Sequence, residues 1–133
     1  MTVGSNSGNI NGSSATGNAF GVRASTTATI NANSGIISGS SGSSGLVYGV
    51  YAGTAAYVTN SSNGEISGTS LGSGSAYGTY GADSVTVSGN SGTIKGTSAT
   101  GNAFGAYAAA SALTVISNGG NINGINTDTG SSG

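Results

Sequence analysis

The side chains that could take part in acid–base, metal or nucleophilic chemistry are few in this sequence. Glu65, Asp83, Asp128, Arg23 and Lys95 are its only charged residues, and it contains no His and no Cys. This composition excludes His-dependent catalytic triads and metal sites built from imidazole or thiolate ligands. The three carboxylates belong to different segments, so they do not form the acid and base pair that polysaccharide hydrolysis requires. The sequence predicts a protein that is not an enzyme and that holds no metal or cofactor.

The low charge also limits which classes of molecule this chain could bind. The formal net charge is −1, and the two basic residues form no patch that could bind nucleic acid or an anionic membrane surface. No apolar run approaches the roughly 18 residues of a membrane-spanning helix, so we expect no direct membrane insertion. The first residues also lack the charged and apolar segments of a secretory signal.

Aromatic residues recur in a six-residue pattern that reads AFGVRA, VYGVYA, AYGTYG and AFGAYA. Strict alternation along a strand would place the second residue of each pattern inward and the fifth outward. The outward side chains would be flanked by the small first and third residues. They form the candidate interaction strip, which consists of Arg23, Tyr51, Tyr80 and Tyr107.

Two interpretations of this strip are open. Exposed aromatic rings beside a flat strip of Ala and Gly can pack against a second copy of the chain or stack on sugar rings. Alternatively, the tyrosines stack on one another between repeats and only stabilise the sheet.

Two repeated strings reveal the organisation that positions these residues. SATGNAFG occurs at Ser14–Gly21 and at Ser98–Gly105, an offset of 84 residues. GNING occurs at Gly8–Gly12 and Gly120–Gly124, an offset of 112 residues. Both offsets are multiples of 28, and a fixed period of this size is typical of a solenoid whose units bury their apolar faces against one another.

Each repeat contains three short extended segments separated by Gly, Ser and Asn. The apolar residues do not show helical spacing. One segment has the pattern G-x-I-x-G, and its isoleucines are spaced by 27, 29, 28 and 28 residues. We expect them to form an inward core stack of Ile10, Ile37, Ile66, Ile94 and Ile122.

Another segment places a Thr or Tyr before an inward aliphatic residue and an Asn three residues after it. Asn suits a corner because its side chain bonds the backbone at turns. Stacked amides can also bond to one another along the axis. The sequence therefore predicts a corner ladder formed by Asn6, Asn33, Asn90 and Asn118. In the third repeat, Ser61 takes the corresponding position.

These patterns predict an all-β fold: a parallel, three-sided β-solenoid with about 28 residues per coil. The absence of Pro agrees with continuous ladders. Residues 1–133 would form one solenoid segment of four complete coils and a partial fifth. We expect it to be uncapped at both ends, with open strand edges that favour association.

The rows V-x-x-N-x-G-x-I-x-G followed by A-F/Y-G-x-Y-A resemble passenger domains of bacterial autotransporters and related filamentous-haemagglutinin-type surface proteins. Val87–Gly96 and Val47–Ala52 carry this resemblance most clearly. It implies a right-handed β-helix, export from the cell, and a role as a stalk, adhesin or surface fibre. No functional residue transfers from it, because the shared motif is scaffold.

The leading functional expectation is a structural solenoid of a cell-surface or secreted adhesin, located outside the cell. Its partners would be further copies of the chain or surface glycans. The alternative is a self-assembling extracellular filament subunit that stacks end to end. A polysaccharide-acting β-helix and an ice-binding β-helix are remote third possibilities. The ice-binding alternative is suggested by an outward column of Thr residues, which Tyr57 interrupts.

Overall fold

The computed structural model describes residues 1–127, which form fourteen β-strands and no helix. The strands belong to three parallel sheets that run along the molecule. Sheet A comprises β1 (Thr2–Val3), β4 (Ala28–Asn33), β7 (Ala55–Asn60), β10 (Ser84–Asn90) and β13 (Leu113–Val115). Sheet B comprises β2 (Asn9–Ser14), β5 (Ile36–Ser41), β8 (Glu65–Ser70), β11 (Thr93–Ser98) and β14 (Asn121–Asn126). Sheet C comprises β3 (Ala19–Ala24), β6 (Val47–Ala52), β9 (Ala76–Gly81) and β12 (Ala103–Ala108).

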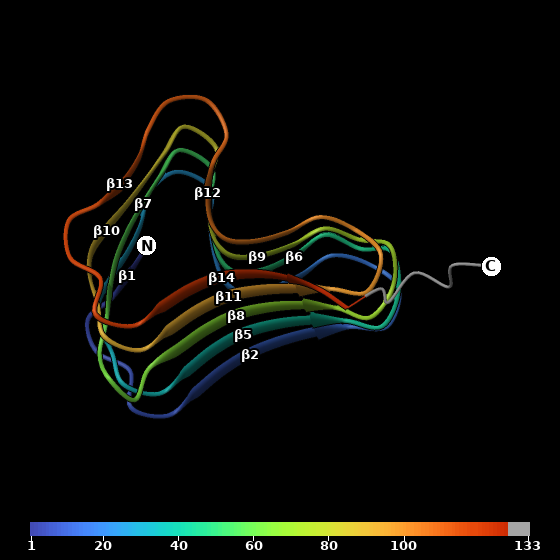
Figure 1. Cartoon of the computed structure of the whole chain (residues 1–133), viewed down its shortest axis with the longest axis horizontal. Helices are drawn as coiled ribbons and strands as arrows, with labels where there is room; N and C mark the ends of the chain where they lie inside the picture. Colours follow the sequence, from blue (N-terminus) through green and yellow to red (C-terminus); the bar gives the residue numbers. More distant parts are fainter. Residues whose placement is uncertain (128–133) are drawn as a thin grey trace.

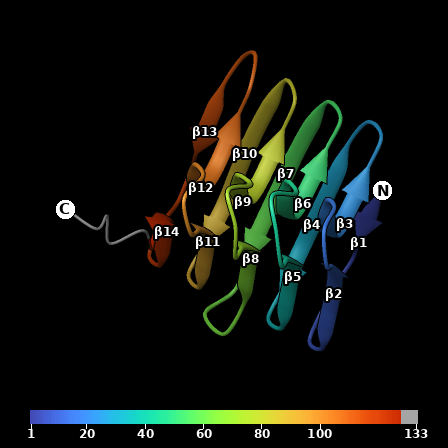
Figure 2. The same cartoon turned by 90° about the vertical axis from the view of Figure 1, so that its right-hand side faces the viewer.

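Strands three positions apart in the chain pair with one another, so each of the first four coils contributes one strand to each sheet (Figure 2). Sheet B keeps strict register, and Ile37 is paired with Ile66, which is paired with Ile94. The fold is therefore the three-sided parallel β-solenoid that the repeat predicts. Viewed along the axis, the coils superimpose (Figure 1).

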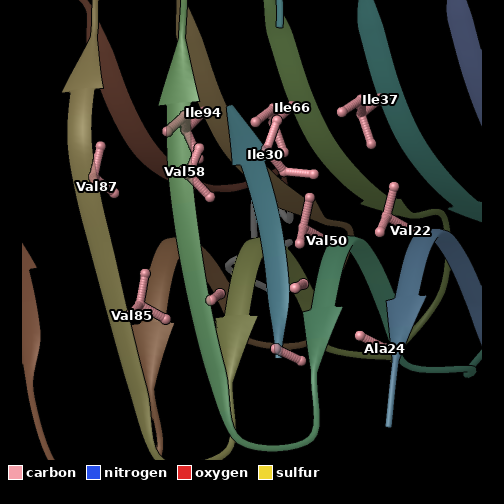
Figure 3. Packing of buried hydrophobic residues seen from close by; sticks show 13 residues of the cluster. Val22, Ala24, Ile30, Ile37, Val50, Val58, Ile66, Val85, Val87 and Ile94 are labelled. Atoms are coloured by element: carbon pink, nitrogen blue, oxygen red, sulfur yellow. The ribbon is translucent and has the colours of Figure 1, made fainter. Parts of the chain in front are cut away.

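The interior is a stack of aliphatic side chains. Ile37, Ile66 and Ile94 are fully buried on the inner side of sheet B, beside Val58 and Val87 of sheet A (Figure 3). Complete burial of one such side chain stabilises the folded state by about 1.5–3 kcal/mol. In the first and last coils, the two remaining members of the predicted core stack are partly buried and pack against this core; they are Ile10 and Ile122.

The outline of the coil has a broad lobe at sheet A and a narrow arm where sheet B faces the beginning of sheet C (Figure 1). In this arm the two backbones lie almost in contact. A Cβ atom added to Gly68 would lie 2.4 Å from the carbonyl oxygen of Tyr77, and one added to Gly49 would lie 2.8 Å from the nitrogen of Ser67. The repeated glycines of both segments are needed because no side chain fits between these sheets.

Sheet C departs from the strict alternation that the sequence suggests. Its strands bend between the arm and the lobe (Figure 1), and Gly49 and Val50 both face the interior at this bend. Because two consecutive residues point inward, Tyr48 and Tyr51 project from the same outer side. The prediction that the two aromatic columns lie on opposite faces is therefore wrong. The flanking Ala and Val residues do not lie beside the tyrosines either, and Val47 is fully buried.

Candidate functional site

The two aromatic columns of sheet C form one cluster, here called the aromatic face. Within a column the rings stack in parallel: the Tyr48 and Tyr77 centroids are 5.0 Å apart at 9°, and those of Tyr51 and Tyr80 are 5.3 Å apart at 4°. Between columns the rings meet edge to face, with 5.0 Å and 73° between Tyr48 and Tyr51. The aromatic face consists of Phe20, Tyr48, Tyr51, Tyr77, Tyr80, Phe104 and Tyr107.

This stacking determines which parts of the rings face solvent. Tyr48, Tyr77 and Tyr80 each lie between the rings of the coils before and after, so both of their π faces are covered, whereas Tyr51 stacks on a ring on one side only. Tyr51 and Tyr80 are partly exposed. A sugar ring stacks on an open aromatic face, so this arrangement favours cross-coil stabilisation over glycan stacking. Each aromatic pair of this kind contributes about 0.5–1.5 kcal/mol beyond its burial.

Arg23 occupies the place of a tyrosine in the first coil. It pairs with Tyr51 across the strands β3 and β6, and its side chain is exposed. Its guanidinium carbon lies 5.2 Å from the centroid of the Phe20 ring. A cation–π contact at an exposed position contributes about 0.5–1 kcal/mol. Arg23 thus continues the aromatic face by covering the first phenylalanine.

Burial and neighbouring phenols raise the pKa of two tyrosines of the aromatic face. Burial, followed by the charges of Tyr77, Tyr80 and Tyr51, raises the pKa of Tyr48 well above its ordinary value. Burial and the neighbouring Tyr51 similarly raise the pKa of Tyr80. Tyr48 and Tyr80 therefore keep neutral hydroxyl groups to higher pH than free tyrosine does.

An asparagine ladder runs along the corner between sheets A and B. Each side-chain Nδ2 donates to the Oδ1 of the asparagine in the next coil, at 2.8–2.9 Å. The same Nδ2 atoms also donate to backbone carbonyls at the corner, as Asn60 does to Gly64 and Thr93. The ladder comprises Asn6, Asn33, Asn60, Asn90 and Asn118.

The third rung corrects one sequence prediction. It is Asn60 rather than Ser61, because β7 is one residue shorter than its neighbours between the buried aliphatic residue and the corner. The pairing of β10 with β7 shifts register between Val87 and Gly89 to absorb this difference. The following turn is longer: six residues separate Asn60 from Ile66, against four from Asn33 to Ile37.

A serine ladder marks the next corner, and the sequence analysis missed it. Ser41, Ser70 and Ser98 are buried, and their hydroxyls donate to the carbonyl oxygens of Gly17, Ser43 and Gly74. The signal for this column is its constant position four residues after each isoleucine of the core stack. These bonds fix the turn between sheets B and C.

The charged residues form no larger cluster. Lys95 Nζ lies 3.2 Å from Glu65 Oε2, and both side chains are about one-third exposed, so this pair contributes at most about 1 kcal/mol. Asp83 Oδ1 accepts a hydrogen bond from the Ser111 hydroxyl. Asp128 lies outside the described residues.

Residues 1–127 offer no metal-binding cluster, pocket or membrane-spanning helix. These residues contain no group of three or more acidic, His or Cys side chains arranged to hold a metal ion. They enclose no pocket. They also include no helix long and apolar enough to cross a membrane.

Comparisons with known proteins give no identification. No family model, curated protein or solved structure matches this chain. The residues of the chain and the solenoid geometry are therefore what bears on its function.

Proposed function

We propose that this chain is a non-enzymatic structural element: a stiff rod segment of an extracellular or cell-surface protein that supports adhesion. The observation that carries the proposal is the unbroken set of ladders joining successive coils. Three parallel sheets, the isoleucine stack, the asparagine ladder and the aromatic face all run along one axis. These contacts hold each coil on the next.

Such a construction resists both bending and proteolysis. Bending the rod would separate two successive coils on one side. This would break the backbone, amide and aromatic-ring contacts that join those two coils. The backbone of the narrow arm is enclosed by close contacts, such as the carbonyl of Tyr77 against Gly68. A protease needs an extended, accessible segment, which ladder-bound backbone does not offer. These properties suit a stalk that works outside the cell.

The resemblance of the rows to autotransporter passengers supports the same setting. Adhesive specificity would then reside in another part of the assembly, with this segment acting as a spacer. The aromatic face, whose rings stack on one another between coils, is assigned to the rod itself.

Two measurements test this proposal. Antibodies raised against the chain should label intact cells of its source organism as strongly as permeabilised cells. Labelling that requires permeabilisation would contradict an extracellular role. In force spectroscopy, a stalk should unfold coil by coil at repeated force peaks, whereas extension without peaks would contradict a load-bearing role.

A self-assembling filament is the second candidate, and the polarity of the asparagine ladder favours it. Asn6 donates its Nδ2 toward the next coil, whereas Asn118 accepts from Asn90 at the opposite edge. The two edges are therefore complementary head to tail, and such contacts generate open filaments. Electron microscopy of the purified chain should then show filaments that Asn118→Ala shortens and Ser117→Ala does not. Monodisperse rods at high concentration would exclude this candidate.

A further inference from the structure

The outer tyrosine column of the aromatic face places phenol rings of successive coils directly over one another. Tyr51 and Tyr80 are stacked at 5.3 Å and 4°, and Tyr80 and Tyr107 at 5.8 Å and 17°. Their Cα atoms are register partners in sheet C, so the backbone keeps the rings aligned. All three side chains are partly exposed.

We propose that this column is a site of oxidative tyrosine cross-linking, at which a carbon–carbon bond joins Tyr80 to Tyr51 or to Tyr107. The oxidant would be hydrogen peroxide acting through a haem peroxidase. The enzyme removes one electron and one proton from each of two phenols, and this reduces one peroxide to two waters. The two phenoxyl radicals couple through ring carbons ortho to oxygen. The hydrogen on each coupled carbon then moves to the phenolic oxygen, which restores both aromatic rings.

The geometry favours this reaction within one chain. Two radicals on neighbouring coils are already in contact, so their coupling avoids the entropic cost of a bimolecular encounter. Adjacent parallel strands lie about 4.8 Å apart, so a bond between facing side chains requires rotation of the rings rather than movement of the backbone. A rotation of each ring about its Cβ–Cγ bond turns one ortho carbon toward the adjacent coil.

The sequence of the aromatic face limits where the bond can form. Phe20 and Phe104 have no hydroxyl at the two ends of the inner column, and Arg23 replaces a tyrosine at the first position of the outer column. Tyr48 is only 5% exposed, which shields the inner pair from an external oxidant. The outer column in coils two to four is therefore the accessible site.

The expected consequence is a covalent staple between coils in a chain without cysteine. A bond between Tyr51 and Tyr80 would close a loop of one coil. Closing a loop of this size restricts the unfolded chain and stabilises the folded state, as a disulfide does. The cross-link would prevent a coil from peeling away from its neighbour.

The test treats dilute purified chain with a haem peroxidase and hydrogen peroxide. We expect monomeric product that has lost two hydrogen atoms and shows dityrosine fluorescence, with fragmentation mass spectrometry placing the bond at Tyr80. A product that is only interchain, or no product, would overturn the proposal. A bond mapped between Tyr48 and Tyr77 would also overturn the assignment to the outer column.

Two matched variants make the test specific. Tyr80→Phe should lower the intrachain yield roughly tenfold, because it removes the shared partner of both outer pairs and their proximity advantage. Phenylalanine is already accommodated in the adjoining inner column, and circular dichroism would verify the fold. Tyr57→Phe, which changes an exposed tyrosine outside the aromatic face, should leave the intrachain yield unchanged. Equal yields from Tyr80→Phe and the unmodified chain would refute the proposal.

Discussion

Asn33 and Asn60 are 27 residues apart in the sequence, yet Asn33 Nδ2 donates a buried hydrogen bond of 2.9 Å to Asn60 Oδ1. Asn60 Nδ2 in turn donates to Asn90 Oδ1 at 2.8 Å. One amide therefore connects three coils through a corner that solvent does not reach. This relationship makes Asn60 the most informative position at which to test the polar ladder.

Asn60→Ala should lower the free energy of unfolding by about 2–4 kcal/mol, because it leaves buried partners of the amide unsatisfied. The affected groups include the side chains of Asn33 and Asn90 and the carbonyl of Gly64. Urea unfolding monitored by circular dichroism measures the change. Ser61→Ala at the adjacent, partly exposed position is the control and should have little effect. Similar losses in the two variants would contradict the assignment of Asn60 to the ladder.

Thr79→Val should stabilise the protein by about 1 kcal/mol, since it removes a buried hydroxyl that makes no hydrogen bond in the folded state. Thr79 is fully buried, and its Oγ1 has no hydrogen-bond partner. It stands in a column in which the preceding coils carry Val22 and Val50, so the valine shape fits. The midpoint of thermal unfolding should rise. Thr69→Val on the partly exposed outer side of sheet B is the control, and a decrease at Thr79 would show that the hydroxyl is used.

Gly68→Ala should destabilise the narrow arm by more than about 2 kcal/mol, through overpacking. The added Cβ would lie 2.4 Å from the Tyr77 carbonyl and 2.9 Å from that of Val47, and backbone atoms cannot move aside as a flexible side chain can. Gly89→Ala is the matched control, because its Cβ would meet only the Thr59 Cγ2 at 4.0 Å. Urea unfolding compares the two. A neutral Gly68→Ala would mean that sheets B and C are not in backbone contact.

Alkaline pH should destabilise the rod through its tyrosines. Burial is the main cause that raises the pKa of Tyr48 and of Tyr80 in the folded state. Unfolded tyrosine ionises near pH 10, so the stability that these phenols contribute is complete below about pH 10 and is lost as the pH rises above it. The thermal midpoint should fall from pH 9 to 11. Tyr48→Phe should weaken this fall, whereas Tyr57→Phe should not, and an unchanged slope in Tyr48→Phe would contradict the assignment.

The sequence was sufficient to predict the repeat, the three sheets and the inner column. The isoleucines report the register reliably because a one-residue slip would turn the whole column outward. Ile66 demonstrates this: its spacing from Ile37 is irregular, yet the two residues are paired. Most of the asparagine ladder followed from the same alignment.

Two features could not be obtained from periodicity alone. Asn60 follows its aliphatic residue one position early, at a register shift in sheet A, so a fixed offset from that residue selected Ser61. The face of Tyr51 depends on the bend at Gly49 and Val50. Strict alternation cannot represent two consecutive inward residues, so it separated aromatic columns that in fact pack together.

Engineered disulfides test the central claim, the in-register stacking of successive coils, most directly. Ser40 and Thr69 are Cα partners on adjacent coils, and the chain has no cysteine to interfere. The Cα atoms of paired residues on adjacent strands are about 4.8 Å apart, which is within reach of a disulfide. Ser40 and Thr97 are two coils apart, at about 9.6 Å, which is too far for a disulfide. Oxidation of the Ser40→Cys/Thr69→Cys variant should give a monomeric disulfide in high yield, and the Ser40→Cys/Thr97→Cys variant should stay reduced. Equal yields, or cross-linking only in the second variant, would contradict the solenoid.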